Sequence, residues 1–225
     1  MVNRMKNKDY KTILNDPQIQ GIYQELEEND TDWYLDHGWG HVSRVMNRTE
    51  ELMQLAGASE EEVQEAVIAA FLHDVGKLEG AKDHAERSYR FAKEYFKKNK
   101  IDFANRKCVQ KAIRVHSDGF DADEILALSL ILADKLDQCP ARLKPAGYEK
   151  AGVRQTQHLL EIKTFLQVDE FNDGCFVVDF ITDGKLDMGK AAPICFDPFN
   201  HVYHRLGEAV GRAMAFILSD QGRGA

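Results

Sequence analysis

The stretch AAFLHDVGK at residues 69–77 joins an apolar run to two ionisable side chains, His73 and Asp74. An imidazole and a carboxylate lose favourable hydration when they are buried, so a buried pair needs partners. Such a pair is either a hydrogen-bonded couple in the core or part of a metal site. The dipeptide alone does not separate these interpretations, because this composition gives about one His-Asp pair by chance.

Other ionisable side chains stand near the ends of other apolar segments: His41, His116 and Asp134, with His84 at an expected helix start. Neutral imidazoles and carboxylates bind divalent ions such as Mn, Fe, Co, Ni, Zn or Mg. Helices that project these groups inward can build a metal site inside a bundle. The order His, His-Asp, Asp on successive helices is much more specific than the dipeptide and favours a metal site.

The segments that carry the first of these residues have the apolar spacing of amphipathic helices. One helix is expected over residues 38–55. The next begins with an S-x-x-E capping box formed by Ser59 and Glu62, and Gly76 stands where a C-terminal cap is expected. Its apolar stripe runs into the His-Asp pair, which predicts that the pair lies on the buried face at the helix end.

Three further helices are expected before residue 140. Asp83 and Glu86 form a second capping box in the sequence, and the helix after that one ends its apolar stripe at His116. The run ILALSLILA at 125–133 is apolar nearly all round, which predicts a central helix. Asp134 and Asp137 follow this run three residues apart and are expected to share a face; Asp137 is expected to orient a metal ligand or a water.

The two ends of the chain have a different character from its middle. Residues 1–36 predict one or two short helices. Residues 164–170 and 175–183 alternate apolar and polar side chains around Asn172-Asp173-Gly174, which predicts a β-hairpin. A last amphipathic helix is expected over residues 200–218.

Composition excludes several classes of protein. Hydrophobic residues make up 44% and charged residues 29% of the 225, an ordinary globular balance. The net charge of −8 argues against a nucleic acid polymer as the main partner, although a small phosphorylated ligand stays possible. The four scattered cysteines fit reduced thiols, and neither a signal peptide nor a membrane span is expected. A cytoplasmic protein without a membrane partner is the resulting expectation.

Four segments resemble the HD-domain superfamily of metal-dependent phosphohydrolases. They are DHGWGHVSRV at 36–45, FLHDVGK at 71–77, AIRVHS at 112–117 and LADKLDQ at 132–138. The resemblance covers about residues 37–140. It implies that His41, His73, Asp74 and Asp134 hold a metal ion. Members of the family that hold two metals add two histidines between the His-Asp pair and the last Asp, and His84 and His116 match those places.

The resemblance and the element pattern together predict a mainly α fold. Residues 1–140 are expected to form a helical bundle like the HD domain, which holds the metal. Residues 141–225 are expected to add a small C-terminal β-hairpin and a last helix, packed on the bundle rather than independent. No oligomeric state is predicted.

The implied activity is hydrolysis of a small phosphorylated metabolite, in the first place a nucleotide, with one or two divalent metal ions as cofactors. Asp74 and Lys77 are the expected catalytic residues; some relatives carry Glu where this chain has Lys77, and a cation there could contact a substrate phosphate. Arg44 is a second candidate for substrate binding, or it forms a salt bridge. Two alternatives remain: an HD-type di-iron oxygenase, and a metal-containing ligand-binding or regulatory module with little turnover.

Overall fold

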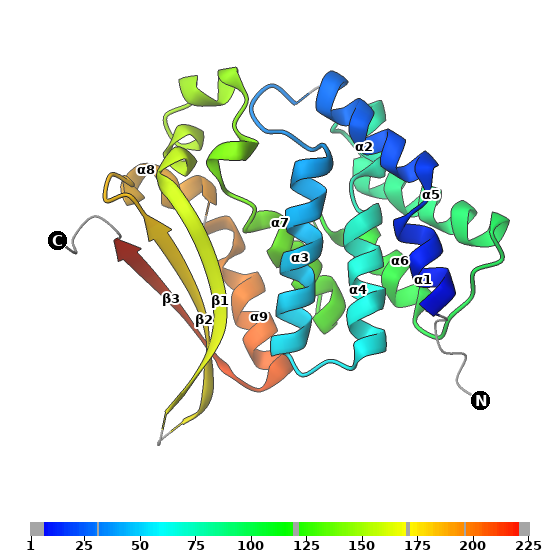
Figure 1. The fold of residues 1–225 in the computed structure, drawn as a ribbon. Coiled ribbons are helices and arrows are strands. Elements are labelled where there is room, and N and C mark those ends of the chain that lie inside the picture. The colour runs from blue at the N-terminus through cyan, green and yellow to red at the C-terminus, as the bar shows by residue number, and fades with distance from the viewer. Residues whose placement is uncertain (1–6, 31, 119–121, 170–171, 196, 221–225) are drawn as a thin grey trace.

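The computed structural model describes residues 7–30, 32–118, 122–169, 172–195 and 197–220. In this described part of the chain, seven α-helices precede a small sheet, and two more α-helices lie between its second and third strands (Figure 1). The helices are α1 Asn7–Leu14, α2 Pro17–Asn29, α3 Trp39–Leu55, α4 Glu60–Leu72, α5 His84–Lys98, α6 Arg106–Val115, α7 Ile125–Lys135, α8 Met188–Cys195 and α9 Asn200–Val210. The strands are β1 Leu159–Asp169, β2 Asn172–Thr182 and β3 Ala213–Asp220. The mainly α fold is confirmed.

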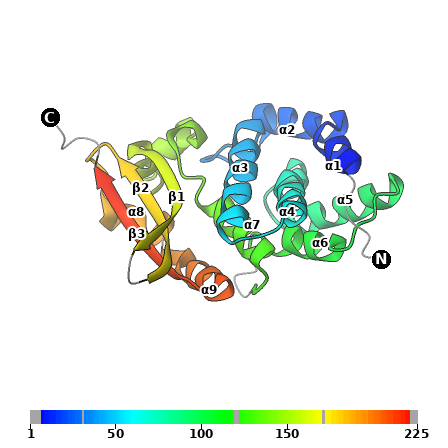
Figure 2. The ribbon, with the colours of Figure 1, turned by 60° about the horizontal axis from the view of Figure 1, so that its bottom comes forward.

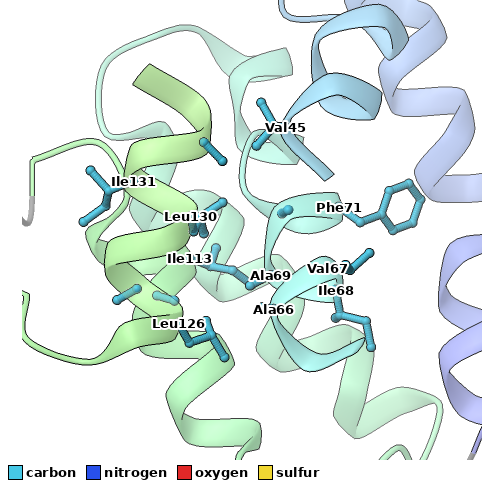
Figure 3. Packing of buried hydrophobic residues seen from close by; sticks show 14 of the residues in the cluster. Val45, Ala66, Val67, Ile68, Ala69, Phe71, Ile113, Leu126, Leu130 and Ile131 are labelled. Carbon is cyan, nitrogen blue, oxygen red and sulfur yellow. The ribbon is translucent and has the colours of Figure 1, made fainter. Parts of the chain in front are cut away.

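Helices α4 and α7 form the centre of the bundle. Every residue of α7 from Leu126 to Asp134 is buried, as expected for a helix that is apolar nearly all round. Figure 3 shows Ala66 and Ala69 of α4 facing Leu126 and Leu130 of α7. Each fully buried leucine stabilises the fold by about 1.5–3 kcal/mol, so this contact fixes the relative positions of the two helix ends that carry ionisable groups.

The three strands form one sheet in the order β1-β2-β3. Strands β1 and β2 are an antiparallel hairpin, whereas β2 and β3 are parallel and are joined through α8 and α9, since parallel neighbours need a crossover connection. Phe176, Val178 and Phe180 alternate along β2 and belong to the same buried cluster as Val202 and Leu206 of α9. In Figure 2 the sheet lies beside the bundle, with α9 between β3 and the bundle.

The hairpin is confirmed, but its details differ from the prediction. The strands are longer than expected, and Asn172 and Gly174 lie inside β2 rather than in the turn. Residues 170–171, which separate the two strands, are outside the described part of the chain.

The expected last helix over residues 200–218 is wrong beyond Val210. Gly211 adopts a φ of +66°, and the Arg212 amide donates to the Gly207 carbonyl oxygen at 2.8 Å, which ends the helix. The following run AMAFILSD is β3, paired with β2 from Cys175 to Thr182. The apolar residues of this run continue the helical spacing of α9 by coincidence. The 3.6-residue period therefore predicted a helix where the chain forms a strand.

The capping boxes have different outcomes. The box of Ser59 and Glu62 is present. The box of Asp83 and Glu86 is not: Asp83 has a φ of +57° and its side chain makes no capping bond, while Glu86 pairs with Arg90 and Arg114. The domain division at residue 140 stays a prediction. Among the described helices, none is both long enough and apolar enough to cross a membrane.

Candidate metal centre

The His-Asp pair lies at the point where α4 ends. The helix stops at Leu72, His73 is its C-cap, and Asp74 precedes a 3₁₀ helix over Val75–Glu79. His73 is fully buried and Asp74 is 2% exposed. Both side chains therefore lie on the buried side of α4 at its C-terminal end. The 3₁₀ helix begins directly after them.

Gly76 brings α5 against this corner. A Cβ atom at Gly76 would lie 2.4 Å from the His84 carbonyl oxygen and 2.7 Å from the Ser88 amide nitrogen. The Gly76 amide donates to the Ser88 hydroxyl at 2.9 Å. Gly76 is thus not the cap of α4, as expected from the sequence, but a close-approach position that sets His84 beside Asp74.

All six predicted metal ligands meet in one place, which we call the His/Asp cluster. Its members come from five helices: His41 from the first turn of α3, His73 and Asp74 from the end of α4, His84 from the start of α5, His116 from the end of α6, and Asp134 from the end of α7. All except His84 are buried. Elements far apart in the sequence thus deliver one ionisable group each, apart from α4, which delivers two.

The four imidazole rings of the cluster are oriented in the same way. Each Nδ1 is within hydrogen-bond distance of an oxygen: His41 with Asp137 Oδ2 at 2.6 Å, His73 with the Ala70 carbonyl at 2.6 Å, His84 with the Ala81 carbonyl at 2.7 Å, and His116 with the Ile113 carbonyl at 2.7 Å. Because a carbonyl or carboxylate oxygen only accepts, each Nδ1 carries the proton and donates it. With Nδ1 bonded in this way, each ring turns its Nε2 atom into the cluster.

The Nε2 atoms and carboxylate oxygens of the cluster lie close together. His84 Nε2 is 3.0 Å from His116 Nε2, and Asp74 Oδ1 is 3.3 and 3.4 Å from these two atoms. On the other side, His41 Nε2 is 3.4 Å from Asp134 Oδ1 and 3.6 Å from Asp74 Oδ2. Lone pairs at these separations repel one another unless a cation lies between them.

This donor set fits a divalent metal ion. His73 Nε2 and Asp74 Oδ1 are buried and have no hydrogen-bond partner, although both are strong acceptors. Imidazole nitrogen and carboxylate oxygen are ordinary ligands of first-row divalent metals. Three overlapping sets of ligand atoms lie within 4.8 Å of one another: His41, His73 and Asp74; His73, His116 and Asp134; and Asp74, His84 and His116.

The pKa values of His41 and His116 are shifted in opposite directions. Burial and Arg142 favour the neutral ring of His41, yet Asp134, Asp137 and Asp74 together raise its pKa to about 9. The pKa of His116, in contrast, is lowered to about 4, first by its burial. The three carboxylates therefore favour positive charge at His41, whereas burial favours the neutral form of His116, which is the form that a metal ligand requires.

Asp137 supports the cluster from outside it, as the sequence predicted. Its carboxylate accepts from His41 and from the guanidinium of Arg44, whose Nε lies 2.6 Å from Asp137 Oδ1. Arg44 thus forms the salt bridge that was its alternative role. It lines a separate cavity toward β1 rather than the cavity over the cluster, so the structure does not bring it to the expected substrate position.

A cavity of about 240 Å³ opens over the cluster. Asp74, His84 and Asp134 line it together with three cationic side chains, those of Lys77, Lys135 and Arg142. Lys77 Nζ lies 2.7 Å from His37 Nε2, and His37 Nδ1 lies 2.8 Å from Asp30 Oδ2, so Lys77 donates to a neutral ring that Asp30 orients. The pKa of His37 is lowered to about 4, mainly by burial.

Sequence reasoning missed two of these cations. Arg142 is 5% exposed and donates to the carbonyl oxygens of Asp36 and Asp137 at 3.2 and 3.0 Å. Lys135 Nζ donates to Asp134 Oδ2 at 2.7 Å. Arg142 follows Pro140, and nothing in the sequence distinguishes it from a surface arginine. Lys135, in contrast, directly follows Asp134, and this position could have indicated a cation beside the cluster.

The comparisons with known proteins assign the middle of the chain to one domain family. The HD-domain family model matches residues 38–139, a segment that contains all six residues of the cluster. A solved structure described as a predicted HD superfamily hydrolase from an uncultured Thermotogales bacterium is 27% identical in sequence. That match covers 57% of this chain and 74% of the other, with a TM-score of 0.45. No curated protein matches the chain. The chain therefore contains an HD domain at residues 38–139.

Proposed function

We propose that this protein is a metal-dependent hydrolase that cleaves a phosphate ester or anhydride in a small phosphorylated metabolite, in the first place a nucleotide. The observation that carries the proposal is the convergence of four imidazoles and two carboxylates beneath a cavity that three cationic side chains line. A cluster of metal ligands alone fits several activities. Cations at the rim of the cluster fit a substrate that brings several negative charges.

His41, His73, Asp74 and Asp134 would hold a first divalent ion, and His84 and His116 would complete a second site with Asp74. Asp74 belongs to two of the three ligand sets, with its two oxygens directed toward different histidines. Ions bound there would supply hydroxide near neutral pH and positive charge for the phosphoryl oxygens. The identity of the metal is left open by this donor set.

Lys77 is the residue of the chain that we assign to the phosphoryl group. Its ammonium lies in the cavity, held by His37, and favours the ionised form of Asp74. Lys135 and Arg142 pair with Asp134 and the backbone, so their charges orient the cluster. Lys77 faces a neutral partner, which leaves its charge available to balance negative charge on a substrate in the transition state.

Lys77→Met removes this charge while leaving the proposed metal ligands in place. We expect turnover of a phosphorylated substrate to fall by about 10²-fold, with unchanged metal content. The assay measures phosphate and dephosphorylated product over a panel of nucleotides, in the absence of oxygen, with metal content measured in parallel. Lys82→Met, an exposed lysine nearby in the chain, is the matched control and should behave like the parent.

Two results would contradict this proposal. One is a Lys77→Met variant that hydrolyses as fast as the parent protein. The other is a parent that releases no phosphate without oxygen but forms an oxidised product with it, which would support the di-iron oxygenase. Tight binding of a nucleotide with no turnover across the panel would support the regulatory module instead.

A further inference from the structure

A second cavity, of about 530 Å³, lies between α5 and α6, and no part of the proposed hydrolysis uses it. Among the residues that the structure describes, six cationic side chains and no acidic one line this α5/α6 groove. They are Lys93 and Lys97 of α5, and Arg106, Lys107, Lys111 and Arg114 of α6. The chain as a whole carries a net charge of −8, so this concentration of one sign is a local feature.

The spacing of these residues places them in two rows along the groove. Lys93 and Lys97 are one turn apart on α5, as are Lys107 and Lys111 on α6. Like charges at this spacing weaken an isolated helix slightly. At 1.5 Å per residue, the row from Tyr89 to Lys97 is about 12 Å long. The groove is therefore an elongated channel with positive side chains on both walls.

The positive charge of the groove is only partly compensated. Arg106 pairs with Asp102 at 2.9 Å, Arg114 with Glu86 at 2.8 Å, and Lys111 with Glu124. All three pairs are at least partly exposed, and pairs of this kind contribute about 0–1 kcal/mol, so an incoming anion can replace them. Among the described residues, Lys93, Lys97 and Lys107 form no ion pair at all.

One end of the groove lies near the His/Asp cluster and carries an aromatic ring. His84 is the first residue of α5, and His116 directly follows α6. At this end the Arg114 guanidinium lies over the Tyr89 ring, 5.4 Å from its centroid. A positive groove that contains an aromatic side chain is the arrangement by which proteins hold single strands without reading their sequence.

We propose that the α5/α6 groove binds the phosphate backbone of a single-stranded nucleic acid. A single phosphate contacts a few of the six cations, whereas successive phosphates of an extended strand engage both rows. The Tyr89 ring beside these cations favours a single strand over a duplex, because the unpaired bases of a strand can stack on an aromatic ring. The inference goes beyond the proposed hydrolysis and does not depend on it, because these residues lie outside the His/Asp cluster.

Fluorescence anisotropy with labelled dT10 and rU10 tests the proposal, with EDTA present and NaCl varied from 50 to 200 mM. The groove variant carries Lys93→Gln, Lys97→Gln and Lys107→Gln. Its control carries Lys8→Gln, Lys98→Gln and Lys185→Gln, three exposed lysines with the same change of net charge. If each lysine contacts one phosphate, the groove variant should bind about 10²-fold more weakly at 50 mM salt. The slope of log K against log salt should fall by about 2. The control triple should bind like the parent.

Lys97→Gln and Lys98→Gln form a second matched pair on adjacent positions of α5, since Lys98 lines a different cavity. Only the first should weaken binding, and Asp74→Ala should leave binding unchanged. The proposal is overturned if neither oligonucleotide binds, if the control triple loses as much affinity as the groove triple, or if Asp74→Ala abolishes binding. It is also overturned if a duplex of equal length binds as tightly as the strand. Preference for rU10 or dT10 identifies which nucleic acid is the partner.

Discussion

The His/Asp cluster and the α5/α6 groove differ in the burial and the pairing of their charged side chains. In and beside the cluster, carboxylates are buried and two of them have cationic partners: Asp134 pairs with Lys135, and Asp137, just outside the cluster, pairs with Arg44. In the groove, six cations are at least partly exposed to solvent and stand beside one another. Buried charges are tolerated only with partners and fixed geometry, whereas exposed charges of one sign create a field that extends into solvent. This difference fits the two proposals, a site that holds an ion in place and a groove that attracts an anionic ligand.

The difference also concerns how the members of each region depend on one another. The residues of the cluster form three overlapping sets whose ligand atoms lie within 4.8 Å of one another, so we expect replacement of one residue to change the protonation and position of its neighbours. The lysines of the groove are separated by turns of helix and by solvent. We therefore expect strong coupling between substitutions in the cluster and nearly additive effects in the groove.

Asp74→Ala is expected to have the largest effect, because Asp74 contributes to two of the three ligand sets. The variant should lose all bound metal, and hydrolysis should fall by more than about 10²-fold. Elemental analysis of the purified protein measures the metal content. The double variant His84→Ala, His116→Ala should keep one ion per chain where the parent holds two.

Asp183→Asn is the control, since this carboxylate pairs with His158 away from the cluster. If Asp74→Ala keeps as much metal as the parent, the site is misassigned. A parent that never exceeds one ion per chain would contradict the two-metal part of the proposal.

Asp137→Asn tests the outer layer of the cluster. An amide accepts less strongly than a carboxylate from His41 and Arg44, so the His41 ring is held less firmly and is a poorer ligand. We expect metal affinity to fall by about 10–100-fold while the metal site is retained. Competition with a chelator of known affinity, followed by metal analysis, measures this change.

Asp30→Asn is the matched control for Asp137→Asn. Asp30 is also a buried carboxylate, paired with His37 and Lys144, but it is not bonded to a residue of the cluster. Both variants should lower the free energy of unfolding, since both leave cations with a weaker partner. Equal loss of metal affinity in the two variants would show that Asp137 acts through general stability alone.

The sequence predicted the helical part of the cluster better than the rest of the molecule. The capping box at Ser59 and the apolar stripe of α4 are local features, so the burial of His73 and Asp74 followed from them. The position of Arg142 depends on carbonyl groups of Asp36 and Asp137, which come together only when the chain is folded.

The sheet and the groove were harder to predict for two different physical reasons. Strand β3 is stabilised by parallel pairing with β2, a long-range contact that overrides the helical spacing of its apolar residues. The net charge of −8 gave no indication of the groove, because a sum over the chain says nothing about how charges are distributed on its surface. The expectation of no nucleic acid partner rested on that sum.

Glu65 extends the comparison to a buried charge that lacks a cationic partner. It is fully buried on α4, its Oε2 accepts from the Asn105 amide at 2.8 Å, and its Oε1 has no partner. Burial raises the pKa of this carboxyl, and the hydrogen bond from Asn105 only partly offsets that rise. A raised carboxyl pKa contributes stability below the pKa of the unfolded chain, near 4.5, and that contribution is lost as the pH rises through the folded value.

Glu65→Gln should therefore stabilise the protein at pH 7 by roughly 1 kcal/mol, the smallest effect among these variants. The gain should shrink toward zero near pH 4, where Glu65 is protonated in both states. Urea unfolding at the two pH values measures the difference, with the exposed Glu94→Gln as a control expected to stay within about 0.5 kcal/mol of the parent. A Glu65→Gln variant that is less stable at pH 7 would mean that Glu65, like Asp74, has a cationic partner when the protein is in solution.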